Sequence, residues 1–151
     1  MYQGKKIVQP SFLKEGDKVA LVSPAYWVPQ EALEQAAEAI KKWGLQPVIG
    51  PHTNSLNVNA YAGTADERAA DLLWALEDDA VKAVICSRGG YGAIHLLNRI
   101  PQECYLQHPK WFISMIMTFL YAVVSPSAAT AVSHSLKVHP ALLMSPQRVL
   151  S

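Results

Sequence analysis

The chain has 151 residues, of which 50% are hydrophobic and 17% are charged, and its formal net charge is +1. This length suits one domain with its own core, and the composition excludes a disordered chain. The small net charge and the absence of a basic stripe give no indication of nucleic acid or an anionic membrane as a partner.

The cysteines and the N-terminus indicate the compartment. The 2 cysteines, Cys86 and Cys104, lack metal-ligand spacing and are too few for a disulfide framework, so we expect reduced thiols. No apolar run follows Lys5 and Lys6, so no signal peptide is expected. These features predict a cytoplasmic protein without a metal or cofactor.

The first third of the chain predicts two strands around a helix. Lys18 to Ser23 is expected to form a buried strand that ends at Pro24. From Gln30 to Trp43, apolar residues recur with helical spacing, and Gly44 suits the end of that helix. Gln46 to Ile49 is expected to be a short second strand.

The middle of the chain repeats this alternation after a polar loop over residues 52–63. Thr64 and Glu67 have the spacing of a capping box, which predicts a helix that continues to about Glu77. Asp66, Glu67 and Asp71 could suggest a metal site, but we expect them to cap and solvate this helix. The following elements are a strand from Val81 to Ser87, a helix from Gly92 to Asn98, and a strand from Trp111 to Ile113.

The alternation of strands and helices predicts a three-layer α/β domain with a doubly wound, mostly parallel sheet. In such folds the carboxyl ends of the strands share one edge, and ligands bind there. We therefore expect Ser23-Pro24-Ala25, the turn over residues 87–92, and the residues after Ile113 to meet at this edge. Tyr61 and Trp27 are either pocket aromatics or loop residues that pack on the core.

The turn Arg88-Gly89-Gly90-Tyr91-Gly92 is the strongest candidate site. Glycine permits φ > 0 and lets another group approach the main chain, and arginine adds a planar cation. The turn predicts a pocket in which backbone N–H groups and a guanidinium face negative charge. The alternative is a structural turn between strand and helix. The spacing matches neither a Walker A loop nor the Rossmann glycine pattern.

The chain changes character after Ile113. Residues 112–124 are almost wholly apolar but are shorter than the roughly 20 residues of a membrane helix. From Ser125 onward, no helical or strand period is recognisable. We therefore predict a domain over residues 1–124 and a tail of unknown structure over residues 125–151.

Five segments follow one another from the first strand to the fourth. They are Leu13 to Ala25, Trp43-Gly44-Leu45, Tyr61 to Leu72, Lys82 to Gly92, and Pro109 to Ile113. In sequence and in order they resemble the LD-carboxypeptidase family, which includes muramoyl-tetrapeptide carboxypeptidases and microcin C immunity proteins.

The resemblance implies a serine hydrolase that releases the terminal D-alanine from murein tetrapeptide during cell-wall recycling. It implies that Arg88, Gly89, Gly90 and Tyr91 form the oxyanion and substrate-binding side of the site, lined by Ser23 and Pro24. The family nucleophile lies in a Gly-Tyr/Phe-Ser-Asp turn just after the fourth strand, and its glutamate and histidine partners lie in a second domain.

The sequence departs from this family pattern after Ile113. Ser114 is the candidate nucleophile, but the glycine, tyrosine and aspartate of the turn are absent, and so is the second domain. None of the 5 histidines lies where the family places its base. The hypothesis is that the chain is frameshifted near codon 113, is a fragment, or has a divergent tail.

Activity of this chain is therefore left open. The alternatives are a non-catalytic remnant that binds peptide or dimerises, and a nucleotide-type binding module. An uncovered apolar surface would also favour self-association.

Overall fold

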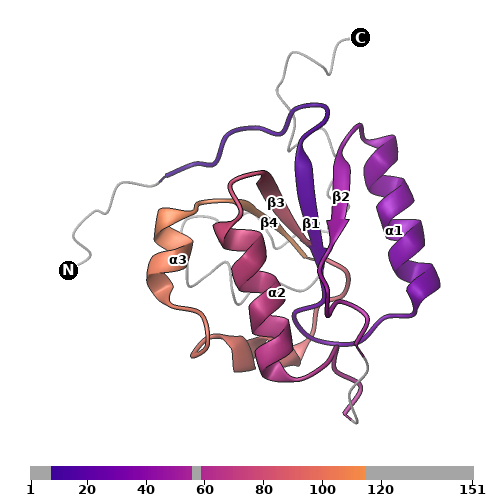
Figure 1. Cartoon of the computed structure of the whole chain (residues 1–151), viewed down its shortest axis with the longest axis vertical. Coiled ribbons are helices and arrows are strands. Elements are labelled where there is room, and N and C mark those ends of the chain that lie inside the picture. Colours follow the sequence, from indigo (N-terminus) through magenta and orange to yellow (C-terminus); the bar gives the residue numbers. More distant parts are fainter. Residues whose placement is uncertain (1–7, 56–58, 115–151) are drawn as a thin grey trace, which may run out of the picture.

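The computed structural model describes residues 8–55 and 59–114. These residues form a sheet of four parallel strands with helices on both faces (Figure 1). The three-layer, doubly wound α/β fold expected from the sequence is thereby confirmed. The boundary at residue 124 and the tail over residues 125–151 lie outside the described residues.

The sheet has the order β2-β1-β3-β4. Its strands are β1 (Lys18–Val22), β2 (Gln46–Ile49), β3 (Val81–Cys86) and β4 (Trp111–Ile113). Every neighbouring pair is parallel, and the ladder between β1 and β3 shifts register between Lys18 and Val19. The four strands predicted from the sequence are therefore correct to within one residue.

The helices divide the core into two clusters. Helix α1 (Gln30–Lys42) packs on one face of the sheet through Leu33 and Ile40, against Val19 and Leu21 of β1. Helix α2 (Ala65–Glu77) covers the opposite face. The helix α3 (Gln102–Gln107) lies on the same side as α2 (Figure 1). Alternate residues of each strand thus point into different clusters, as expected for a sheet buried on both faces.

Two local signals in the sequence are confirmed in detail. The Glu67 backbone N–H donates to the Thr64 hydroxyl at 3.2 Å, and the Thr64 N–H donates to the Glu67 carboxylate at 2.7 Å. These hydrogen bonds hold the pKa of Glu67 below its ordinary value. Gly44 follows α1 with φ of 79°, the left-handed conformation that glycine adopts at a helix end.

The segment after β3 differs from the expected helix over residues 92–98. It is a 3-10 helix, labelled η1, over Tyr91–Leu96, and it has no side-chain hydrogen bond at its first turn. Helix α3 was not predicted, because none of its residues is buried and its sequence carries no apolar period.

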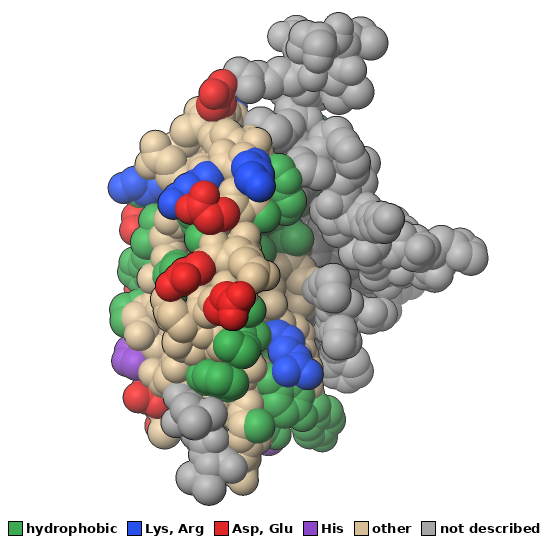
Figure 2. All heavy atoms as spheres, turned by 90° about the vertical axis from the view of Figure 1, so that its right-hand side faces the viewer, with side chains coloured by type: hydrophobic (Ala, Val, Ile, Leu, Met, Phe, Trp, Pro, Cys, Tyr) green, Lys and Arg blue, Asp and Glu red, His purple; other side chains and the backbone are tan. Residues whose placement is uncertain are grey.

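The outer face of α1 carries mixed charge. Its exposed side chains include Glu31, Glu34, Glu38, Lys41 and Lys42. Figure 2 shows acidic and basic side chains intermingled on this face. A face of this kind is an ordinary solvated helix surface, with no single-sign field to attract a charged polymer. No helix among the described residues has the length and apolar character needed to cross a membrane.

Candidate active site at the carboxyl edge of the sheet

The strand order reverses between β1 and β3, so their carboxyl ends form the topological switch point where doubly wound folds bind ligands. Ser23 follows β1 and Ser87 follows β3, and their hydroxyl oxygens are hydrogen-bonded to each other at 2.5 Å. Ser23 is buried, at 3% exposure, and Pro24 is buried beside it. The hydrogen bond between Ser23 and Ser87 joins the carboxyl ends of β1 and β3. The side chains of Ser23 and Pro24 are buried and are not exposed to solvent.

Arg68 of α2 ties three loops of this edge together. Its side chain is buried, and Nη1 donates to the Pro24 carbonyl and to the Gly92 carbonyl, both at 2.8 Å. Nε donates to the Thr64 carbonyl at 3.3 Å. Burial lowers the pKa of Arg68, although an arginine remains charged in proteins. One guanidinium thus fixes the loop after β1 relative to the glycine turn after β3.

Two tyrosines and a second arginine extend this arrangement into a stack. The Cζ atom of Arg68 lies 4.8 Å from the ring centroid of Tyr61, and the Tyr61 ring stacks on Tyr26 at 5.2 Å. Arg88 continues the stack, with its Cζ atom 5.5 Å from the centre of the Tyr26 ring. The order is therefore Arg68, Tyr61, Tyr26, Arg88, with one arginine buried and the other exposed.

The glycine turn lies directly against these rings. Gly90 has φ of 149°, and a Cβ atom there would come within 2.3 Å of Cδ2 of Tyr26. A Cβ atom on Gly92 would come within 2.6 Å of Cε1 of Tyr61. Both glycines are thus required by close approach to an aromatic ring, as the sequence suggested for an unspecified neighbour.

The turn leaves backbone donors available. Within the described residues, the N–H groups of Arg88, Gly89 and Gly90 donate to no acceptor. Gly89 is buried, whereas the Tyr91 side chain points outward with 71% exposure. Buried backbone N–H groups without a partner, such as that of Gly89, are rare in folded proteins, and several oriented N–H groups together can hold an anion or a developing negative charge.

Ser114 follows β4, next to the end of β3. The register pairs Ile85 with Ile113, and the Ser114 side chain is hydrogen-bonded to that of Cys86. Burial raises the pKa of the Cys86 thiol to about 12, and the bond from Ser114 offsets this only in part. A neutral thiol is a poor proton acceptor, so this contact does not activate the Ser114 hydroxyl.

His52 forms a pair with Asp71 at the same edge, but far from Ser114. Its Nδ1 atom lies 2.8 Å from Oδ1 of Asp71, and the backbone N–H of His52 donates to the same carboxylate. His52 follows β2, which three strand spacings of about 4.8 Å, or about 14 Å in all, separate from β4. His52 is therefore too distant to act as a base for Ser114.

Asp71 corrects an expectation from the sequence. It does not solvate the start of α2: it is buried at 3% exposure, and it also accepts a hydrogen bond from the Thr53 hydroxyl at 3.3 Å. A Cβ atom on Gly50 would come within 2.5 Å of this carboxylate. Asp71 thus anchors the loop after β2.

Other histidines of the described residues also have neighbours of their own. The His95 ring contacts Tyr61 and Tyr91 edge-on, at 6.1 and 6.2 Å between centroids. His108 lies 3.7 Å from the Asp79 carboxylate, at the opposite edge of the sheet. His134 and His139 lie outside the described residues.

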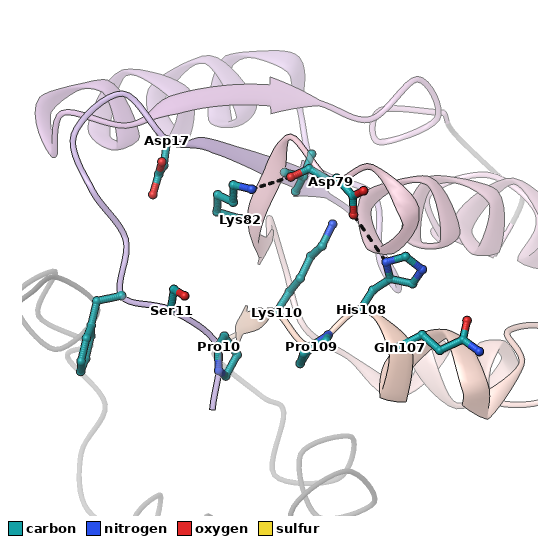
Figure 3. A pocket seen from close by; sticks show the side chains of 11 residues that line it. Pro10, Ser11, Asp17, Asp79, Lys82, Gln107, His108, Pro109 and Lys110 are labelled. Carbon is teal, nitrogen blue, oxygen red and sulfur yellow. Dashed lines mark hydrogen bonds and ion pairs between the residues drawn. The ribbon is translucent and has the colours of Figure 1, made fainter. Parts of the chain in front are cut away.

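A pocket of about 250 Å³ lies at that opposite, amino edge, where Asp17 precedes β1 and Asp79 precedes β3 (Figure 3). Its charged side chains already have partners. Lys110 donates to the carbonyls of Ala75 and Asp78 at the end of α2, at 2.9 and 2.6 Å, and Lys82 donates to the Asp79 carbonyl. The charged groups of this pocket therefore have a structural role, in which Lys110 attaches the start of β4 to the end of α2.

Sequence reasoning missed Arg68 and Tyr26. The signal for Arg68 was its place in α2, three residues after Ala65 and four before Leu72, on a face that is otherwise apolar. A charged residue on such a face is buried only if its donors are satisfied, so it points to a structural network. Tyr26 carried no signal of its own, and Trp27 donates to the Asn54 carbonyl instead of lining the site.

The sequence profile of the LD-carboxypeptidase N-terminal domain matches residues 19–120. This chain belongs to the LD-carboxypeptidase family. It is 34% identical, over 83% of its length, to the "probable murein peptide carboxypeptidase" of Bacillus subtilis. It is also 34% identical, over 53% of its length, to the murein tetrapeptide carboxypeptidase of Pseudomonas aeruginosa.

The structural comparison agrees. The muramoyltetrapeptide carboxypeptidase from Oxalobacter formigenes superimposes with a TM-score of 0.61 and 25% identity, over 70% of this chain and 36% of its own. This LD-carboxypeptidase likeness confirms the family resemblance seen in the sequence. The chain spans 40% of the Bacillus relative and 26% of the Pseudomonas relative.

Proposed function

We propose that this chain binds murein tetrapeptide and forms the nucleophile side of a serine-type LD-carboxypeptidase, which releases the terminal D-alanine during cell-wall recycling in the cytoplasm. The observation that carries the proposal is the carboxyl edge of the sheet. There the turn over residues 88–90 offers unpaired N–H groups, and Ser114 follows the neighbouring strand. The printed names of the Bacillus and Pseudomonas relatives supply the substrate class.

The chemistry of acyl transfer explains why these groups belong together. A serine hydroxyl attacks the scissile carbonyl, and the carbonyl oxygen becomes an oxyanion in the tetrahedral intermediate. Donors that are already oriented lower the energy of that charge more than they stabilise the substrate. In the proposal, Ser114 supplies the hydroxyl and the N–H groups of Arg88, Gly89 and Gly90 supply the donors.

A second candidate function is peptide binding without turnover. It is favoured by His52 and His108, because His52 is engaged by Asp71 about 14 Å from β4 and His108 lies at the amino edge. A serine without a base loses several powers of ten in rate. Both candidates share the same binding site and differ only in catalysis.

One pair of measurements tests both. The purified 151-residue chain is titrated with a tetrapeptide that ends in L-Lys-D-Ala, and D-alanine release is followed on the same samples. Binding supports the shared site, and the absence of binding contradicts the proposal. Turnover that disappears in Ser114→Ala and persists in Ser11→Ala assigns the nucleophile, because Ser11 lines the pocket at the amino edge. Binding without turnover selects the second candidate.

A further inference from the structure

We infer that Arg88 binds the free α-carboxylate at the C-terminus of the peptide, and so makes this edge selective for chain ends. The inference rests on the proposed function, because it assigns one part of the same peptide to one side chain. It starts from the different surroundings of the two arginines in the Arg68–Tyr61–Tyr26–Arg88 stack.

The buried arginine of the stack has no capacity left for a ligand. Arg68 donates to the carbonyls of Pro24, Gly92 and Thr64, and its side chain is hidden from solvent. Its role is to hold the loops and the Tyr61 ring. A carboxylate that is bound by a guanidinium of this stack therefore has to be bound by Arg88.

The exposed arginine has the opposite character. Within the described residues, Arg88 makes no ion pair and no side-chain hydrogen bond, and its one recorded contact is with the face of Tyr26. A guanidinium that lies over an aromatic ring keeps its N–H groups at its edge, where they can donate outward. The face of the Arg88 guanidinium thus rests on the Tyr26 ring, and the N–H groups at its edge remain available to a ligand.

The position of Arg88 relative to the turn is also fixed. Gly90 passes so close to Tyr26 that a methyl group would not fit, and the Tyr26 backbone forms a bridge with Tyr61. The ring that supports Arg88 therefore also supports the turn with the unpaired N–H groups. A peptide whose terminal residue is processed at those N–H groups presents its carboxylate one residue away from the scissile carbonyl.

A carboxylate is the anion that fits this description. Its two oxygens match the fork of a guanidinium in a paired, charge-assisted hydrogen bond, which lysine cannot reproduce. An internal peptide bond offers no such group. Arg88 would therefore distinguish a chain end from an internal residue.

The test compares two ligands that differ only in this group. The full chain is titrated with the tetrapeptide ending in L-Lys-D-Ala as the free acid, and with the same peptide as its C-terminal amide. We expect the acid to bind at least about tenfold more tightly, since a hydrogen bond to a charged partner is worth more than one factor of ten. Arg88→Gln should abolish the preference, and Arg88→Lys should retain part of it.

The control is Arg99→Gln, because Arg99 is partly exposed but is paired with Asp66 at 2.7 Å. It should leave the preference unchanged. Equal binding of acid and amide to the unaltered chain would overturn the role of Arg88 and leave the proposed function standing. A preference that survives in Arg88→Gln would overturn it too. Failure of both peptides to bind would contradict the proposed function and the inference together.

Discussion

The two edges of the sheet differ in what their polar groups are already bound to. At the amino edge a pocket is lined by Lys82, Lys110 and His108, and each of them has a partner in the protein. The carboxyl edge instead leaves the N–H groups of residues 88–90 and the Arg88 side chain without a hydrogen-bond acceptor among the described residues. A pocket is thus weaker evidence for a site than hydrogen-bond donors that the fold positions but does not use.

The largest expected effect comes from removing the buried guanidinium that organises the carboxyl edge. Arg68→Met leaves the carbonyls of Pro24 and Gly92 without their donor, and we expect it to lower the free energy of unfolding by about 4 kcal/mol. Urea denaturation measures this. Arg99→Met is the control and should cost less than about 1 kcal/mol, because its ion pair is exposed. Equal losses would mean that Arg68 does not organise the edge.

A smaller effect is expected from closing the gap between the turn and Tyr26. Gly90→Ala combines a positive φ with a Cβ contact of 2.3 Å, so we expect a loss of about 3 kcal/mol in stability. Gly16→Ala is the matched control, because Gly16 also has positive φ but no atom within 4 Å of an added Cβ. It should cost about 1 kcal/mol. Equal melting temperatures for the two variants would show that Tyr26 does not contact the turn.

Cys86, at the end of β3, should make the folded chain less stable at alkaline pH. The pKa of Cys86 is raised from 9.0 to about 12 in the folded chain, so the unfolded chain releases this proton first. Stability should therefore fall as pH rises from 9 toward 12, by at most about 1.4 kcal/mol per pH unit from this group. Cys86→Ala should flatten the slope measured between pH 9 and 10. An unchanged slope in Cys86→Ala would show that the thiol is solvated.

The smallest expected effect concerns the amino edge. Lys110 donates to the last carbonyls of α2, and Lys110→Met should lower the free energy of unfolding by about 1 kcal/mol without changing peptide binding. Lys82→Met, whose lysine is exposed, should cost about half as much. Loss of peptide binding in Lys110→Met would contradict the assignment of the two edges.

The elements that could be predicted are those with a local signal. Each of these signals lies within a short stretch of sequence. They are the capping box at Thr64, the apolar run of β3 and the glycine after α1, and the element predicted from each is confirmed. Helix α3 and the 3-10 form of η1 could not be predicted, because α3 has no fully buried residue and the glycines at the start of η1 lie against Tyr26 and Tyr61.

The site shows the same limit. The turn at Arg88 was found from its glycines, but its partners are polar residues that pattern analysis assigns to the surface. Arg68 and Asp71 are buried because each binds a loop that is distant in sequence: Arg68 binds the Pro24 carbonyl, and Asp71 binds His52 and Thr53. Such networks depend on tertiary contacts. Their only sign in the sequence is a charged residue on an otherwise apolar helix face.

Backbone NMR of the 151-residue chain tests the central claim most directly, because it reports on both edges in one titration. On addition of the tetrapeptide ending in L-Lys-D-Ala, we predict the largest amide shifts at Arg88, Gly89 and Gly90, and unchanged positions for Gln107, His108 and Lys110. Shifts centred on the amino edge, or no shifts at either edge, would contradict the account.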